Sequence, residues 1–267
     1  MTSYDSFADV YDELMDNVPY QLWADQYAEI LRSYGIEDGL VCDLACGSGN
    51  MTMELARRGF DMIGIDDSEA MLNRAREKSK ENAGGTDSAD DVGGGNSILY
   101  LLQDMCEFEL YGTVRAVTCA CDSINYLLTE EEVLACFKLV NNYLDPGGIF
   151  LFDFNTAEKY AGQIGDSCIA ENREGCSFIW ENEYDEESGI NTCELTLFVR
   201  RGHLFERNIE THLQRGYEPE EMKELIIQAG LEFIGFYPIM QADGQAEAGR
   251  LLAVARECGK QPAEENS

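Results

Sequence analysis

The feature that most constrains the fold is a glycine-rich turn between a predicted strand and a predicted helix. Residues 41–50 read Val-Cys-Asp-Leu-Ala-Cys-Gly-Ser-Gly-Asn, an apolar run followed by Gly47 and Gly49. Glycine lets a ligand approach the backbone closely, and the N-terminus of the next helix offers N–H groups to an anionic group. In an open parallel sheet this joint is the expected ligand crevice. The motif therefore predicts a binding site at the end of the first strand.

Apolar strand-like runs alternate with amphipathic helical segments on both sides of this turn. A leading helix is expected over 18–34, and a capping box formed by Thr129 and Glu132 begins a later one. Asp145-Pro-Gly-Gly is expected to end that helix and turn the chain into the fifth strand. The predicted strands lie at 39–45, 61–65, 98–102, 114–121 and 149–154. Such β-α alternation indicates the α/β class with a parallel sheet.

The alternation breaks after the fifth strand. Runs at 178–184, 193–200 and 204–213 are separated by Gly189 and Gly202 rather than by helices, which predicts an antiparallel β insertion. A helix at 218–229 and runs at 231–237 and 250–255 then complete the core.

These patterns predict how the chain is divided. Residues 82–97 hold five glycines and three aspartates without Lys or Arg, which predicts a flexible surface insertion. The expected parts are an N-terminal helical segment packing on the core (1–38), a core (39–155 and 215–257), the β insertion on the substrate side (156–214) and a polar tail (258–267).

Composition restricts the partners. The 267 residues include 19 Lys and Arg against 51 Asp and Glu, a net charge of −32, which repels phosphate backbones and anionic membranes and argues against nucleic acid. No apolar run approaches the roughly 18 residues needed to span a bilayer, and the first residues lack a leader pattern. The ten cysteines do not follow zinc-site spacing, and only two histidines are present. We expect a cytoplasmic protein with reduced thiols and no metal site, whose oligomeric state the sequence does not indicate.

Carboxylates follow the second and third predicted strands. Asp66 lies 17 residues after Gly49, where an acidic side chain meets ribose hydroxyls in nucleoside-binding sheets. Its neighbour Asp67 lies near the same ligand, and either Asp67 or Ser68 caps the next helix. Asp104 ends the third strand and could accept a hydrogen bond from an exocyclic amine. Three strand ends therefore converge on one nucleoside.

Two residues argue against a dinucleotide. The third glycine of a dinucleotide motif would stand at position 52, where the chain has Thr52. Asp43 precedes the glycines, where it would repel a pyrophosphate. These residues favour a nucleoside with a cationic appendage.

Four segments resemble the motif series of the class I S-adenosylmethionine-dependent methyltransferases. They are Asp43-Leu-Ala-Cys-Gly-Ser-Gly-Asn, Gly64-Ile-Asp-Asp-Ser-Glu-Ala-Met-Leu, Leu102-Gln-Asp-Met and Leu144-Asp-Pro-Gly-Gly, in the right order on the right elements between residues 39 and 155. The resemblance implies a Rossmann-like, seven-stranded, mostly parallel sheet with helices on both faces and an antiparallel last strand. It also implies S-adenosylmethionine as cofactor and methyl transfer as the activity.

The resemblance assigns cofactor contacts by position. Gly47 and Gly49 would approach the methionine part with Asp43 nearby, and Asp66 would hold the ribose. Asp104 and the Met105 backbone would contact adenine. The backbone at Ala120 and Cys121 would face the amino group.

Two further segments look like the small-molecule-type bacterial branch of that superfamily. They are Tyr4-Asp-x-Phe-Ala-x-x-Tyr11-Asp and Asp122-Ser-Ile-Asn-Tyr-Leu. The chain lacks the Asn/Asp-Pro-Pro-aromatic segment of enzymes that methylate exocyclic amines of adenine, cytosine or glutamine. Nitrogen, oxygen and carbon acceptors all remain open, and a small molecule is expected.

Several side chains are candidates for the acceptor side. Methyl transfer from a sulfonium is an in-line displacement, so positioning and desolvation matter most. Tyr126 and Asp122 are the candidate catalytic residues. Tyr11, Tyr20 and Trp23 are candidates for cofactor contact, and Asn155, His212 and Tyr217 for acceptor contact. The acidic run from Glu171 to Ile190 is either a solvated face or a lid over the acceptor.

Three rival functions stay open at this point. The same enzyme could act on RNA or a protein, which a basic surface beside the crevice would favour. The chain could bind the cofactor or a partner without catalysis. A nicotinamide oxidoreductase is the third, and Thr52 and Asp43 argue against it.

Overall fold

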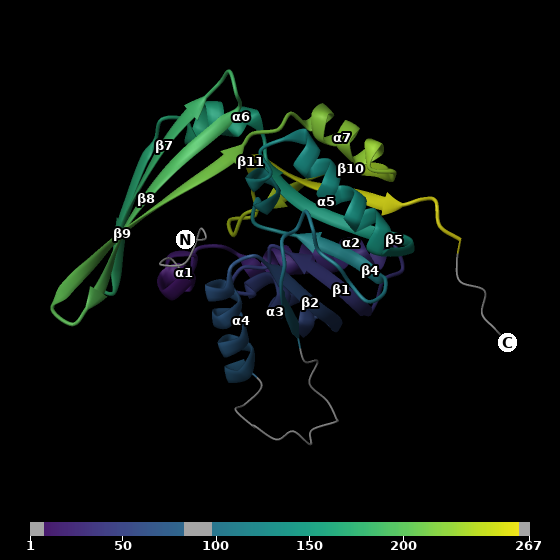
Figure 1. Ribbon diagram of the computed structural model, residues 1–267, viewed down its shortest axis with the longest axis horizontal. Helices are drawn as coiled ribbons and strands as arrows, with labels where there is room; N and C mark the ends of the chain where they lie inside the picture. The colour runs from purple at the N-terminus through teal and green to yellow at the C-terminus, as the bar shows by residue number, and fades with distance from the viewer. Residues whose placement is uncertain (1–7, 83–97, 262–267) are drawn as a thin grey trace.

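The computed structural model describes residues 8–82 and 98–261, which form two sheets with helices around the larger one (Figure 1). The predicted insertion, apart from Asn82, lies outside the described residues, as do the predicted tail from residue 262 onward and the Tyr4 end of the N-terminal motif. Within the described part, no helix has the length and apolar character needed to cross a bilayer.

The longer helices fall where the sequence predicts them, and the structure adds four short ones among the described residues, which are α1 (Ala8–Leu14), η1 (Ser123–Tyr126), α6 (Ala157–Lys159) and η2 (Tyr160–Ile164). The leading helix is α2 (Tyr20–Ser33), and α1 precedes it. The other helices are α3 (Asn50–Arg57), α4 (Glu69–Asn82), α5 (Glu130–Tyr143) and α7 (Pro219–Gln228). The capping box of α5 is confirmed, because the Glu132 N–H donates to Thr129 Oγ1 at 3.2 Å and the Thr129 N–H donates to Glu132 Oε2 at 2.9 Å.

Seven strands form the main sheet in the order β10-β11-β5-β4-β1-β2-β3. They are β1 (Gly39–Leu44), β2 (Phe60–Asp66), β3 (Leu99–Leu102), β4 (Val114–Cys119), β5 (Leu144–Asn155), β10 (Leu231–Met240) and β11 (Ala246–Glu257). Only β11 runs antiparallel to its neighbours, and the other pairs are parallel. The predicted Rossmann-like α/β fold is confirmed.

The start of the fifth strand differs from the prediction. The expected turn at residues 145–148 is part of β5, which begins at Leu144 directly after α5. Gly147 has a φ of 73°, and the register with β4 shifts between Val114 and Ala116. The glycine thus allows an irregular strand start rather than a separate turn.

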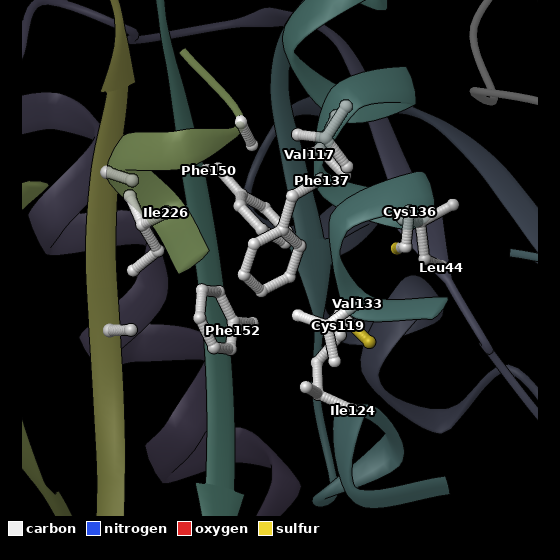
Figure 2. Packing of buried hydrophobic residues seen from close by; sticks show 14 of the residues in the cluster. Leu44, Val117, Cys119, Ile124, Val133, Cys136, Phe137, Phe150, Phe152 and Ile226 are labelled. Atoms are coloured by element: carbon white, nitrogen blue, oxygen red, sulfur yellow. The ribbon is translucent and has the colours of Figure 1, made fainter. Parts of the chain in front are cut away.

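Two apolar cores cover the faces of the main sheet, because its central strands are buried on both sides. Successive side chains alternate, so Phe150 and Phe152 of β5 enter one core while Leu151 enters the other. On the first face, Phe137 of α5 packs against those two rings, with centroids 5.2 and 5.0 Å away (Figure 2). α7 completes this face, and α2 and α3 cover the opposite one.

The predicted insertion forms a separate antiparallel sheet in the order β6-β7-β8-β9. Its strands are β6 (Cys168–Asn172), β7 (Cys176–Asp185), β8 (Ile190–Arg201) and β9 (Leu204–Arg215). Strand β6 was not predicted, because all five of its residues are exposed and no apolar alternation marks it. Val10 and Leu14 of α1 pack on this smaller sheet, whereas α2 packs on the main one. The division into domains stays a prediction.

Candidate active site

A cavity of about 530 Å³ lies at the carboxyl ends of β1 to β4. Parallel strands bring these ends to one edge of the sheet, so residues far apart in sequence meet there. The lining residues are Tyr11, Tyr20, Asp43, Ala45, Cys46, Gly47, Ser48, Asn50, Met51, Asp66, Asp67, Met71, Gln103, Asp104, Met105, Cys106, Glu107, Ala120, Cys121, Ser123, Tyr126, Leu127 and Glu132.

The glycine loop forms one wall of the cavity. Gly47 has a φ of 54°, and a Cβ placed on it would meet no heavy atom within 4 Å, so its backbone is open to a ligand. Gly49 has a φ of 78°, and a Cβ there would lie 2.7 Å from the Tyr100 hydroxyl. Glycine is therefore required at position 49 for packing as well as for conformation, whereas at 47 it leaves space.

Asp43, at the end of β1, connects the elements on either side of this loop. Its carboxylate is buried and accepts hydrogen bonds from Thr52 Oγ1 at 2.5 Å and from Thr118 Oγ1 at 2.8 Å. Burial raises the pKa of Asp43 to about 6, against the opposing effect of the two hydroxyls. Thr52, which replaces the third glycine of a dinucleotide motif, thus ties α3 to β1.

Asp66 joins two loops at the end of β2. Its Oδ2 accepts the Gly47 N–H at 2.7 Å, and its Oδ1 accepts the Ser68 N–H at 2.9 Å. Burial raises the pKa of Asp66 to about 6. Ser68 caps α4 by accepting the Met71 N–H at 3.3 Å, which leaves the exposed Asp67 as a lining residue. Of the two predicted caps, the structure has Ser68.

Carboxylates dominate the charge of the cavity. Asp104 accepts the Cys106 N–H at 2.6 Å. Burial raises the pKa of Asp67, and the negative charge of Asp104 raises it further. The acidic lining residues are Asp43, Asp66, Asp67, Asp104, Glu107 and Glu132, and no Lys or Arg is among the described residues that line the cavity. The site therefore suits a cationic ligand and disfavours a pyrophosphate.

Comparisons with known proteins agree with this geometry. A methyltransferase-domain family model matches residues 41–148. Bacillus subtilis YqeM, which is named as a methyltransferase, is 38% identical over 232 residues, covering 86% of each chain. A Geobacillus protein with the same kind of name is 34% identical over 85% of this chain and 88% of its own length. The chain belongs to the class I S-adenosylmethionine-dependent methyltransferase superfamily.

More distant matches carry names with substrates. A Streptomyces venezuelae dTDP-3-amino-3,4,6-trideoxy-glucopyranose N,N-dimethyltransferase is 30% identical over 55% of this methyltransferase and 56% of its own length. Among solved structures, an S-adenosylmethionine-dependent methyltransferase from Clostridium acetobutylicum superposes with a TM-score of 0.80 at 25% identity, covering 96% and 99% of the two chains. CalS10, an amino pentose methyltransferase from Micromonospora echinaspora solved with S-adenosylmethionine, has a TM-score of 0.71 at 21% identity, covering 93% and 97%. At this level of identity, the likeness to CalS10 shows that the two chains share a fold.

The N-terminal part of the methyltransferase closes one side of the cavity. Asp12 of α1 accepts hydrogen bonds from Ser48 Oγ at 2.7 Å and Lys78 Nζ at 2.7 Å, and pairs with Arg74 at 3.1 Å. Burial raises the pKa of Asp12, but Lys78 and Ser48 bring it below its usual value. This contact brings α1 onto the glycine loop. Asp12 was not a predicted site residue, although it directly follows Tyr11 in the N-terminal motif.

The three aromatic candidates separate in the structure. Tyr11 and Tyr20 line the cavity, and burial raises the pKa of both hydroxyls. Trp23 does not line it. Its indole N–H donates to the Met240 carbonyl at 2.8 Å, and its ring lies 4.4 Å from the Arg250 guanidinium. Trp23 therefore belongs to the packing between α2 and the β10–β11 edge, and its contact with the cofactor stays a prediction.

The loop after β4 is held by a buried aspartate on β5. Asp153 Oδ2 accepts the Cys121 N–H at 3.0 Å and the Tyr27 hydroxyl at 3.0 Å, and its Oδ1 accepts the Asp122 N–H at 2.8 Å. Arg250 of β11 pairs with Asp153 at 2.5 Å. Cys121 and Asp122 have φ values of 62° and 49°, a conformation that L residues rarely adopt. Tyr27 and Arg250 fix Asp153, and the two N–H groups that Asp153 accepts hold this loop against the cavity.

The two catalytic candidates lie differently with respect to the cavity. Tyr126 lines it, whereas Asp122 does not. The Asp122 carboxylate accepts from Gln214 Nε2 at 2.9 Å and lies 3.6 Å from Arg250 Nη2. Its side chain thus anchors the loop to β9 and β11.

The acceptor candidates lie behind the cavity wall. His212 does not line the cavity, but its Nδ1 lies 3.5 Å from the hydroxyl of Tyr126, which does. Asn155 accepts from Lys159 Nζ at 2.8 Å, and the Tyr217 hydroxyl donates to the Leu127 carbonyl. Both residues thus make contacts in the structure around the cavity and are not among the residues that line it, and their contact with an acceptor stays a prediction.

The acidic run from Glu171 to Ile190 also lies away from the cavity. Its described residues lie mainly on β6, β7 and the turn that follows, and none of them lines the cavity. The geometry favours the interpretation as a solvated face.

The buried pair predicts a large cost for removing its acid. We expect Asp153→Ala to lower the free energy of unfolding by about 3–5 kcal/mol, because it removes the closest counter-charge of the buried Arg250 and the acceptor of the buried donors that point at Asp153. Glu232→Ala is the matched control, since it removes the exposed Arg256–Glu232 pair from the adjoining β10–β11 hairpin and should cost about 1 kcal/mol or less. Urea unfolding of both variants measures this. Equal losses of unfolding free energy in the two variants would contradict the role of Asp153 as the buried support of this loop.

Proposed function

We propose that this methyltransferase binds S-adenosylmethionine in the acidic cavity and transfers its methyl group to a small, neutral or cationic acceptor. The observation that supports this most is the combination of an open glycine loop with six carboxylates and no Lys or Arg among the described lining residues. S-adenosylmethionine carries a positive sulfonium, which supplies the methyl group for an in-line displacement. A cavity of this charge attracts such a cation.

Each part of the cofactor has a candidate partner. The open backbone at Gly47, beside Gly49 and above Asp43, suits the methionine part. Asp66 and the exposed Asp67 are the carboxylates for the ribose hydroxyls. The group at the end of β3, Asp104 with Met105, suits adenine, and the backbone at Ala120 and Cys121 suits the amino group. Tyr11 and Tyr20 would cover the cofactor from the N-terminal side and exclude water.

The acceptor would enter beside Tyr126. This hydroxyl lines the cavity and has His212 behind it. It is therefore the candidate for orienting the acceptor, or for taking the acceptor's proton while it passes its own proton to His212 Nδ1. Carboxylates at Glu107 and Glu132 make an anionic acceptor unfavourable. The names of the amino-sugar relatives agree with an amine acceptor, which we therefore place first among the three acceptor types.

Calorimetric titration tests the cofactor. We expect S-adenosylmethionine and S-adenosylhomocysteine to bind with dissociation constants of about 1–100 μM, and NAD not to bind, because its pyrophosphate would face the carboxylates. Binding of NAD alone would overturn the proposal. Binding without methyl transfer to any member of a panel of amines, alcohols and activated carbon acids would favour a catalytically silent cofactor-binding protein.

The affinity should also depend on pH. Asp43 and Asp66 have pKa values raised to about 6, so they lose their negative charge as the pH falls through 6. We expect S-adenosylmethionine to bind roughly tenfold more weakly at pH 5 than at pH 7 for each such group that needs its charge. The free protein should respond in the opposite sense, because a raised carboxyl pKa stabilises the fold most at low pH and this gain is lost as the pH rises through 6. Calorimetry at constant ionic strength measures both. An affinity that stays constant from pH 5 to 7 would contradict this role.

A pair of variants on β2 tests the ribose contact. Asp66→Ala should weaken S-adenosylmethionine binding by about tenfold or more, since it removes the ligand contact and the support of the Gly47 N–H. Asp61→Ala is the control, because Asp61 is an exposed aspartate at the other end of the same strand. We expect it to leave the affinity unchanged. An Asp66 variant with wild-type affinity would remove the ribose from this position.

A further inference from the structure

Strand β9 is a long unpaired edge of the smaller sheet. It pairs with β8 over all twelve residues without a bulge, and it is the last strand in the order β6-β7-β8-β9. On its other side, no strand pairs with it within residues 8–82 and 98–261. Figure 1 shows the β8–β9 turn at the far left tip of an arm that projects away from the main sheet. Exposed edges of this length usually pair with another strand or are blocked.

Apolar side chains occupy the exposed face of this edge strand. Phe205, Ile209 and Leu213 are 52%, 48% and 42% exposed, and they alternate along one face of β9 with Arg207 and Thr211. The opposite face of the sheet packs on α1 through Leu195, Leu197 and their neighbours. The apolar stripe is therefore additional to the face that the fold already buries.

The charge of this hairpin differs from that of the rest of the chain. Residues 190–215 contain three glutamates and four arginines, a local net charge of +1, in a chain whose total is −32. Two copies of so acidic a protein repel one another over most of their surface. The β8–β9 hairpin is a place where they can approach without this repulsion.

We propose that β9 pairs antiparallel with β9 of a second copy of this chain, which joins the two four-stranded sheets into one of eight strands. This proposal does not rest on the proposed function. A symmetric antiparallel pair has its twofold axis perpendicular to the sheet, so facing residues must lie on the same face and their numbers must add to an even total. Only a few registers meet this condition.

One of these registers is complementary. Centring the axis on Ile209 places Ile209 opposite Ile209 of the partner subunit, Phe205 opposite Leu213, and Arg207 opposite Thr211. Centring it on 207 or 211 places arginines opposite arginines, and centring it on 208 places Glu206 opposite Glu210. In the Ile209 register, Arg207 also approaches Glu194 of the partner subunit, because Glu194 is exposed and neighbours Thr211 on β8.

The pairing ends at a contact already present. In this register residues 204–214 pair with one another, and Arg215 lies just beyond. The Arg215 carbonyl accepts from Asn125 Nδ2 at 2.7 Å and is thus occupied within the chain. The available edge and the complementary register therefore have the same length.

Light scattering after size exclusion tests the dimer on the full-length chain. At about 50 μM, the wild type should have a measured mass of twice the 29.9 kDa chain mass, because a homodimer of ordinary affinity is assembled at this concentration. Ile209→Lys places two ammonium groups together on the axis and should weaken dimerisation by roughly a hundredfold. Ile169→Lys is the matched control, since Ile169 is 50% exposed on β6, the opposite edge of the same sheet. It should remain dimeric.

Cross-linking tests the register. Directly opposite residues of antiparallel strands are close enough for a disulfide. With the exposed Cys168 and Cys258 changed to serine, Ile209→Cys should form a disulfide-linked dimer under oxidation, and Ile169→Cys should not. A monomeric wild type, an Ile209→Lys variant that stays dimeric, or a dimer that Ile209→Cys does not cross-link would each overturn the proposal. Thermal melts of the lysine variants check that both still fold.

Discussion

Buried carboxylates that bind backbone N–H groups or hydroxyls hold the ends of the strands together, and the site depends on them. Asp43 ties β1 to α3 and β4, Asp66 ties the glycine loop to the start of α4, and Asp153 ties β5 to the loop after β4. Each exchanges solvation for several fixed donors, which burial would otherwise make costly. Since the donors belong to the glycine loop, the start of α4, the loop after β4 and the adjoining α3 and β4, the shape of the cavity follows from satisfying these groups.

The same burial gives the cavity its chemical character. Carboxylates that are kept from water have raised pKa values at Asp43 and Asp66, and they lie beside others that remain exposed. Carboxylates clustered in this way repel one another and lose solvation, and a cation bound against them offsets this cost. The hairpin at the tip of the arm differs, because its charges nearly balance and its apolar side chains face outward. Charge is thus distributed unevenly over a chain that is acidic overall.

Much of the fold could be predicted because it depends on local patterns. Apolar alternation, the capping box at Thr129 and the glycine turn indicate strands, helices and their joints without long-range information. β6 escaped this reasoning, because its residues are all exposed and its pairing with β7 decides its conformation. The candidates Asn155, Tyr217 and Trp23 lie on or beside correctly predicted elements. Whether such a side chain faces the cavity or the surrounding structure is decided by its tertiary contacts.

The sequence by itself determined the α/β class, the glycine loop and the carboxylates at the ends of β2 and β3, because strand ends and motif spacing are properties of neighbouring residues. Only the tertiary structure showed that Asp12, Asp153 and Arg250 support the site, because their partners are distant in sequence. The Asp12 contact to Lys78 spans 66 positions, and the Arg250 contact to Asp153 spans 97. Only the sheet order left β9 at an edge. Long-range pairing in space has no signature in a local pattern.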